Sequence, residues 1–248
     1  MADFETYRAG YEKNWAGLKI RPERQNEANR EAARILGGKP RYAAVEERTG
    51  VPWWFVGLCH YRESHFNFAT YLGNGQPLNR KTTIVPKDRG PFQTFEDGAV
   101  DALQFQGFVG LKDWSIERVC YRLEGFNGYG YHDPYVRGTK QKLGRAVPSP
   151  YLYGGSTVYE KGKYTRDHYF DPNFVDTQLG TLVILKALLA LDATIRFPAD
   201  NITAMPMQQE APAIPSPPDV EPVPSKPGPP PAPPGVWSTF WKNFTKRG

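Results

Sequence analysis

A proline-rich stretch near the carboxyl end limits how much of this chain can fold. Between residues 206 and 234, 13 of 29 residues are proline. Proline has a fixed φ and no backbone N–H, so such a stretch cannot complete a helix or a sheet and adopts an extended, polyproline-like form. We therefore expect one folded domain over residues 1–200, a linker over 201–235 and a separate segment over 236–248.

The segment after the linker has the pattern of an amphipathic helix. Trp237, Phe240, Trp241 and Phe244 recur at positions i, i+3, i+4 and i+7, which puts four aromatic rings on one face. We expect this helix to dock on a membrane surface or on a partner protein. The alternative is that it folds back on its own domain, which a long proline spacer disfavours.

Composition excludes several classes of protein. Lys and Arg exceed Asp and Glu by 31 − 26 = 5, which favours an anionic partner, but the basic residues are dispersed and no nucleic-acid partner is expected. The longest apolar run, residues 179–192, contains Lys186 and is too short to cross a bilayer, so it predicts a core helix. Cys59 and Cys120 lie in apolar helical patterns and are expected to be buried free thiols.

The stretch VPWWFVGLCHYRES, residues 51–64, predicts a buried helix that ends on an acid. Val56, Cys59, His60 and Glu63 fall on one stripe at i, i+3, i+4 and i+7. Glu63 is therefore expected on the apolar face of the last turn, where burial and the negative end of the helix dipole both disfavour its charged form. A raised pKa would suit a general acid that cleaves a glycosidic bond.

Two other interpretations of Glu63 stay open. A glutamate near a helix end is most often exposed to solvent or paired with an arginine, here Arg62 or Arg48. A metal site of His60, Glu63 and His65 fits less well, because its spacing differs from the His-Glu-x-x-His arrangement that puts two imidazoles on one helical face. No metal and no organic cofactor is expected.

The next segments carry further candidate site residues. Residues 66–86 combine short β-type runs with the turn sequence GNGQPLN, which predicts a small hairpin or loop excursion forming one wall of a cleft. Thr94 is the expected N-cap of the following helix, with Asp97 three residues on in a variant capping box. Gln93 comes just before that cap, in a position to face the cleft.

Two aromatic segments suit contact with sugar rings. Glycines at 125, 128 and 130 allow a tight turn that presents Phe126, Asn127 and Tyr131. The segment over residues 149–170 is rich in tyrosine and includes Tyr151. It is interpreted either as a glycan-contacting loop or as a loop whose tyrosines cover the core.

Three of these motifs together carry a family resemblance. RES at 62–64, GPFQ at 90–93 and FNGYGY at 126–131, in this order, resemble the motifs of the lysozyme-like superfamily in its lytic transglycosylase and goose-type lysozyme branch. The run SPYLYGGSTVYEKGKY is similar to phage-type endolysins. The resemblance covers about residues 40–195. It implies an α+β, mainly α, lysozyme-like domain with a small β-hairpin beside the cleft.

The resemblance also implies an activity and roles for individual residues. The activity is cleavage of the β-1,4 bond between N-acetylmuramic acid and N-acetylglucosamine in peptidoglycan. Glu63 would be the general acid, and Ser64 would orient it or the substrate. The other substrate-binding residues would be Gln93, Phe126, Asn127, Tyr131 and Tyr151. GPFQ has Pro-Phe where the family pattern has Leu-Met, and FNG stands where that pattern has Tyr-Asn-Ala.

The sequence leaves the second catalytic group open. A hydrolase uses a second carboxylate, whereas a lytic transglycosylase can work with one acid that then becomes the base. Asp97, Asp101 and Glu124 are candidate carboxylates, and each also suits a structural role. Thr82 and Thr83 are candidates for positioning a water molecule. The single-acid mechanism is slightly favoured.

The first residues lack the basic and apolar regions of a secretory signal, so we expect synthesis in the cytoplasm. By the same resemblance, the enzyme would reach the cell wall through a phage holin or as part of a phage-like particle. Two other functions fit the sequence. One is a chitinase-like hydrolase of the same superfamily, and the other is a non-catalytic glycan-binding or particle-structural protein on the same fold.

Overall fold

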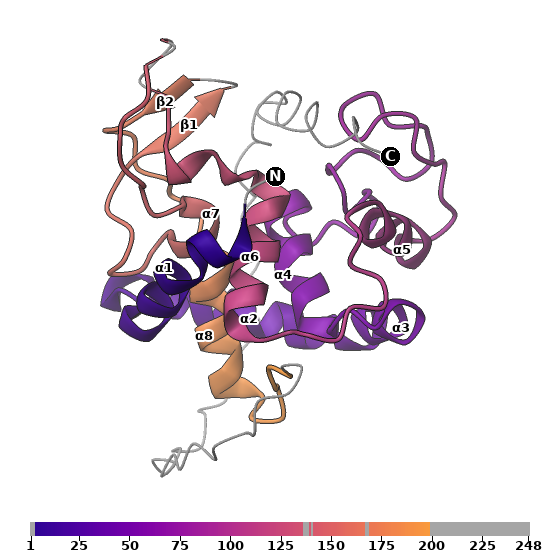
Figure 1. The fold of residues 1–248 in the computed structure, drawn as a ribbon. Helices are drawn as coiled ribbons and strands as arrows, with labels where there is room; N and C mark the ends of the chain where they lie inside the picture. The colour runs from indigo at the N-terminus through magenta and orange to yellow at the C-terminus, as the bar shows by residue number, and fades with distance from the viewer. Residues whose placement is uncertain (1–2, 136–138, 140, 167–168, 199–248) are drawn as a thin grey trace.

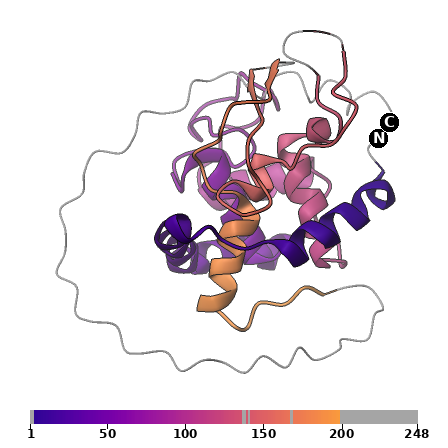
Figure 2. The same cartoon turned by 90° about the vertical axis from the view of Figure 1, so that its left-hand side faces the viewer.

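The computed structural model shows a mainly helical domain with a two-stranded antiparallel sheet (Figures 1 and 2). It describes residues 3–135, 139, 141–166 and 169–198. Within these residues, the expected class of α+β with mostly helix is confirmed. The predicted linker over 201–235 and the predicted aromatic helix over 236–248 lie outside the described residues.

Helices α1 to α5 fill the first half of the described chain, and the two strands come late in it. In chain order the elements are α1 (Phe4–Gly17), η1 (Pro22–Arg24), α2 (Gln25–Gly37), α3 (Lys39–Thr49), α4 (Trp53–Ser64), α5 (Phe95–Phe105), α6 (Ile116–Asn127), η2 (Tyr129–His132), α7 (Pro150–Tyr153), β1 (Lys163–Arg166), β2 (Tyr169–Asp171) and α8 (Thr181–Leu191). In the sheet, Tyr164 pairs with Phe170, and the register shifts after this pair.

Helix α4 forms the centre of the core. Every residue from Trp53 to Tyr61 is buried, so the helix is enclosed on all sides rather than along the one stripe that the sequence pattern predicts. The ring of Phe55 meets those of Phe108 and Trp114 edge-on, with centroids 5.8 and 5.0 Å apart. Aromatic rings bury large apolar areas, so they dominate the free energy that holds α4 in place.

Helix α8 is the second core helix. It packs along α2 and also contacts α4 and α7. The core helix predicted over residues 179–192 is therefore confirmed, with the observed bounds Thr181–Leu191. Lys186 keeps its ammonium group 3.9 Å from the centre of the Trp15 ring, which gives the charge a favourable place at the edge of the core. In the described part of the chain, no helix is long and apolar enough to span a membrane.

Two local predictions are confirmed. Thr94 caps α5, because its Oγ1 accepts a hydrogen bond of 3.1 Å from the Asp97 N–H. Cys59 and Cys120 are both buried and free. Burial raises the pKa of both thiols well above the usual range, so they behave as small apolar side chains.

The segment between α4 and α5 is a loop without a regular hairpin. In its described residues, the strand pairing is one isolated bridge between Thr70 and Pro77. Gln76 satisfies the backbone in place of a ladder, because its Oε1 accepts from the Thr83 N–H at 2.8 Å. The loop form of the prediction for residues 66–86 therefore holds, and the hairpin form is wrong. The small sheet lies instead in β1 and β2, at the same end of the domain as this loop in both views (Figures 1 and 2).

The α4–α5 loop approaches the end of α4 closely at Gly75. Its φ is +70°, and a Cβ atom at this position would lie 2.7 Å from the backbone carbonyl oxygen of Glu63. A side chain would therefore meet both an unfavourable backbone conformation and an atom that cannot rotate away. Glycine at position 75 lets the loop pack directly against the turn that carries Glu63.

Gly75→Ala is expected to destabilise the domain more than Gly50→Ala does. Gly50 has a similar φ of +73° but open space around its Cβ position, so it isolates the conformational cost. We expect a loss of about 1 kcal/mol in the free energy of unfolding for Gly50→Ala and about 2–3 kcal/mol for Gly75→Ala. Chemical denaturation of both variants measures the difference. Equal losses would contradict the close contact at Glu63.

Candidate active site

Glu63 lies in the last turn of α4, where the helix leaves the core. The helix stops there because His65 takes a left-handed conformation with φ 51°. Glu63 is half-buried, and its Oε1 accepts a hydrogen bond of 3.0 Å from the hydroxyl of Tyr151. Tyr151 is fully buried in the short helix α7, so the donor is held in one place. The structure therefore joins two residues that the sequence predicts for the site.

The surroundings of Glu63 favour its protonated form. Burial raises the pKa of Glu63 to about 8, although the hydrogen bond from Tyr151 and the charge of Arg62 act in the opposite direction. Burial, followed by the charge of Glu63, raises the pKa of the Tyr151 hydroxyl well above its usual range, so Tyr151 remains a donor. At neutral pH, Glu63 therefore holds a proton that it can give to a bound group.

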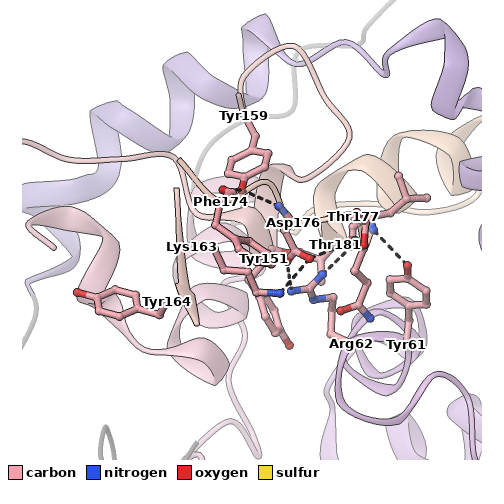
Figure 3. A network of polar contacts seen from close by, with 12 residues as sticks. Tyr61, Arg62, Tyr151, Tyr159, Lys163, Tyr164, Phe174, Asp176, Thr177 and Thr181 are labelled. Carbon is pink, nitrogen blue, oxygen red and sulfur yellow. Dashed lines mark hydrogen bonds and ion pairs between the residues drawn. The ribbon is translucent and has the colours of Figure 1, made fainter. Parts of the chain in front are cut away.

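Arg62 precedes Glu63 in α4 but forms its ion pair with a different carboxylate (Figure 3). Its Nη2 lies 3.5 Å from Oδ2 of Asp176, and its Nη1 donates to the Leu179 carbonyl oxygen at 3.0 Å. The guanidinium also lies over the ring of Tyr151, 4.8 Å from the centroid. Arg62 thus supports the ring that donates to Glu63, and its direct ion pair is with Asp176.

Asp176 is a charged residue of this region that sequence reasoning missed. It is only 4% exposed, and Lys163 of β1 donates to its Oδ1 at 3.0 Å (Figure 3). Burial raises the pKa of the Asp176 carboxyl, but the charges of Arg62 and Lys163 outweigh burial, so the pKa lies below its usual range. The sequence signal was weak: a carboxylate shortly before the apolar run that begins at Leu179.

Three predicted substrate-binding residues are not joined to Glu63 by the described contacts. The Ser64 hydroxyl donates to the His60 carbonyl oxygen one turn back, at 3.4 Å. Gln93 is exposed in the loop just before α5, and Asn127 is half-buried at the last position of α6. Ser64 thus bonds to its own helix, as serine often does near a helix end. The role of orienting Glu63, predicted for Ser64, is taken by Tyr151.

Two predicted sugar contacts, Phe126 and Tyr131, are core residues in the structure. Phe126 is 3% exposed and packs with its ring centroid 5.9 Å from that of Phe108. Tyr131 is 4% exposed, accepts a hydrogen bond of 3.1 Å from the Tyr164 N–H, and packs against Tyr164 of β1 and Phe170 of β2 in a second small core. Phe126 belongs to α6 and Tyr131 to η2, and large rings gain more by such burial than by facing solvent.

Thr82 and Thr83, the predicted water-positioning residues, form hydrogen bonds within the α4–α5 loop. Thr82 is 3% exposed, and its hydroxyl donates to the Pro86 carbonyl oxygen and accepts from the Arg89 N–H. Thr83 is exposed, and its hydroxyl accepts from the Gln76 amide at 2.9 Å. Both hydroxyls therefore help to hold the α4–α5 loop together.

The three candidate second carboxylates all have structural partners. Asp97 forms an ion pair with Arg48 at 3.1 Å. Asp101 accepts a hydrogen bond of 2.8 Å from the Tyr71 hydroxyl, and Glu124 accepts one of 2.6 Å from the Tyr11 hydroxyl. Asp101 is also paired with Arg89, and Glu124 with His132. Each carboxylate is thus held by groups other than Glu63, in the structural role that the sequence left open for it.

His60 and His65 do not form a metal site with Glu63. His60 is fully buried and shares a hydrogen bond of 2.9 Å with the Tyr42 hydroxyl, and burial lowers its pKa to about 4. His65 is exposed, with its Nε2 3.2 Å from Nη1 of Arg34. Among the described residues, no group of three or more His, Cys, Asp or Glu side chains is arranged to hold a metal ion.

Comparisons of the chain with protein-family models, with curated proteins and with solved structures find no match. The candidate site is therefore defined by its own geometry. Its parts are a carboxyl that keeps its proton at neutral pH, a buried tyrosine that donates to it, and the ion pairs of Arg62, Asp176 and Lys163 behind that tyrosine. Such an arrangement can donate a proton and then accept one.

The raised pKa of Glu63 predicts how stability depends on pH. Between the ordinary carboxyl pKa of 4.5 and about 8, folded wild-type protein holds a proton that the unfolded chain releases, so its stability falls as pH rises. Glu63→Gln removes this titration. The free energy of unfolding of the variant, minus that of wild type, should rise by on the order of 2 kcal/mol from about pH 4 to about pH 9, since partial exposure reduces the full effect.

Thermal unfolding of both proteins across this pH range measures the difference. Glutamine can still accept a hydrogen bond from Tyr151, so any difference between glutamine and protonated Glu63 adds a constant offset, and the slope is the informative quantity. A difference that stays constant across the range would contradict a raised pKa at Glu63.

Proposed function

We propose that this chain is a peptidoglycan-degrading glycosidase on a lysozyme-like domain, with Glu63 as its general acid. One observation carries the proposal: burial at the end of α4 raises the pKa of Glu63 to about 8, and a fixed tyrosine hydroxyl orients the carboxyl. A carboxylic acid that stays protonated at neutral pH is what cleavage of a glycosidic bond requires. The sequence resemblance to lytic transglycosylases and phage-type endolysins points to the same residue.

In the first step, Glu63 would give its proton to the oxygen that bridges the two sugars. The bond from this oxygen to C1 of the N-acetylmuramic acid would break, and the N-acetylglucosamine side would leave with a free hydroxyl. Glu63 is then an anion in a place where burial disfavours charge. The Tyr151 hydroxyl stabilises this anion, because it donates to the same carboxyl.

In the second step, the anion would act as a base. It would take the proton from the C6 hydroxyl of the same muramic sugar while that oxygen bonds to C1. The products would be a 1,6-anhydro end and a protonated Glu63, ready for another turnover. This single-acid route needs no second carboxylate, which agrees with the structural partners of Asp97, Asp101 and Glu124. Asp176 is neutralised by two cations and is a poor base.

The net charge and the sequence resemblance suggest the setting of the proposed activity. The net charge of +5 would favour binding to an anionic cell wall. The enzyme would be made in the cytoplasm and would act at the wall as a phage-type endolysin delivered by a holin, or as a lysin in a phage-like particle. The aromatic segment over 236–248 would tether it to a membrane surface or a partner protein.

A second candidate function is a non-catalytic glycan-binding or particle-structural protein on the same fold. One observation favours its particle-structural form: Phe126 and Tyr131, two expected sugar contacts, are core residues and are not exposed to a glycan. This alternative predicts binding to the wall without release of fragments.

Digestion of purified peptidoglycan tests the proposal. Wild-type protein should release fragments with anhydro-muramic ends, and Glu63→Gln should lower the rate by about 10²–10⁴-fold, the range of general acid catalysis. Glu46→Gln is the matched control, because Glu46 is another half-buried glutamate whose pKa burial raises. Its rate should stay within about twofold of wild type, as for a surface substitution away from the site.

Mass spectrometry of the released fragments separates the outcomes. Reducing ends in place of anhydro ends would make the enzyme a hydrolase and overturn the single-acid route. Wall binding with no fragments from wild type would overturn the enzymatic proposal and support the glycan-binding alternative. Equal loss of rate in the Glu46 and Glu63 variants would remove Glu63 from the mechanism.

A further inference from the structure

A hollow of about 350 Å³ lies where the end of α2 and the start of α3 meet the chain just after α4. Tyr42, Phe66 and Phe68 contribute aromatic rings to its lining, and Arg34 and Arg41 contribute guanidinium groups. The Gly37–Gly38 turn between α2 and α3 completes it. None of the proposed catalytic steps uses this hollow. Its combination of flat apolar surface and two cations is the composition of a small-ligand site.

Both arginines are held in position before any ligand arrives. Arg34 lies over the Phe66 ring at 4.5 Å, and Arg41 lies over the Phe68 ring at 4.1 Å. Side chains fixed by stacking lose little rotamer freedom when they bind a ligand. The two guanidinium groups are therefore preorganised donors at the rim of the hollow.

Each arginine also has a carboxylate partner, which sets the charge that remains. Arg41 binds Glu96 through Nε and Nη2, at 2.6 and 2.9 Å. Arg34 binds Glu31 at 3.0 Å, and Arg30 binds the same carboxylate at 3.2 Å. Arg34 and Arg41, which line the hollow, are therefore balanced by Glu31 and Glu96, since 2 − 2 = 0. Nε of Arg34 and Nη1 of Arg41 take no part in these ion pairs, so they are the donors that the rim offers to an anion, and the aromatic lining favours an anion carried on apolar carbon.

The hollow lies close to the proposed general acid along the chain. Phe66 follows Glu63 by three residues, so their Cα atoms are at most about 11 Å apart. A peptide of three residues spans the same distance of about 10–11 Å when extended. In peptidoglycan, a short peptide rich in carboxylates is attached to the muramic sugar, next to the bond that Glu63 would cleave.

We propose that this hollow binds a carboxylate of the acidic stem peptide of peptidoglycan, through Arg34 and Arg41. The inference rests on the proposed function, since that function supplies the substrate. It adds a preference: strands that carry their peptides would be bound more tightly than bare glycan. Nε of Arg34 and Nη1 of Arg41 donate to the carboxylate, and the rings of Phe66 and Phe68 cover the carbon chain next to it.

Calorimetric titration with the synthetic peptide L-alanyl-γ-D-glutamyl-diaminopimelate tests the site without any cleavage. The double variant Arg34→Gln/Arg41→Gln should weaken binding by at least about tenfold, and amidation of the peptide carboxylates should do the same to wild type. The control is Arg30→Gln/Arg48→Gln. Arg30 pairs with Glu31, as Arg34 does. Arg48 joins α3 to α5 through Asp97, as Arg41 does through Glu96. Neither Arg30 nor Arg48 lines the hollow.

The control variant should bind the peptide within about twofold of wild type, because it removes matched ion pairs outside the hollow. Equal weakening in both double variants, or no binding by wild type at millimolar peptide, would overturn the proposal. Cleavage of peptide-free glycan strands separates this test from the proposed function. The Arg34/Arg41 variant should cleave such peptide-free strands at the wild-type rate. A clear fall in this cleavage rate would also overturn the proposal, because the hollow would then act on the glycan itself. If wild type cleaves no strands at all, the proposed function fails, and the titration still decides whether the hollow binds carboxylates.

Discussion

The hydrogen bond from Tyr151 to Glu63 is the contact on which the candidate site depends. It joins residues 88 positions apart, one at the end of the central helix α4 and one in the short helix α7. Each side is fixed separately: α4 by burial from Trp53 to Tyr61, and α7 by the Thr181 hydroxyl of α8, which donates to the Tyr151 carbonyl oxygen at 3.2 Å. The core therefore sets the position of the acid, because both partners belong to it.

The ion pairs beside this hydrogen bond explain why Glu63 keeps its proton next to an arginine. An arginine adjacent in sequence would ordinarily stabilise the charged carboxylate and lower its pKa. The charge of Arg62 does lower the pKa of Glu63, but less than burial raises it, and the ion pair of Arg62 is with Asp176, which Lys163 also neutralises. The sequence places Arg62 and Glu63 side by side, and the fold gives them different partners. Burial then dominates at Glu63, whereas opposite charges dominate at Asp176.

Sequence patterns correctly predicted those features that depend on residues close together in the chain. The helix ending at Ser64, the cap at Thr94, the core helix over 179–192 and the buried cysteines follow from periodicity and capping, and the structure has all of them. Long-range packing decided the rest. Asp176 pairs with Arg62 and Lys163, which lie 114 and 13 positions away in the sequence, and no motif marks it. Phe126 and Tyr131 pack into the main core and the second small core, respectively. These contacts come from distant parts of the chain, so a local stretch of sequence does not reveal them.

The central claim is that Glu63 holds a proton at neutral pH because its carboxyl is largely withdrawn from solvent and is oriented by Tyr151. Carbon-13 NMR of selectively labelled glutamate carboxyls, with Glu63 assigned by its loss in Glu63→Gln, measures its pKa directly. We predict a midpoint near 8 in wild type. A higher value is expected in Tyr151→Phe, because a hydrogen bond to the charged form is lost, and no change in Tyr153→Phe. A midpoint near 4.5 in wild type, the ordinary carboxyl value, would contradict the account.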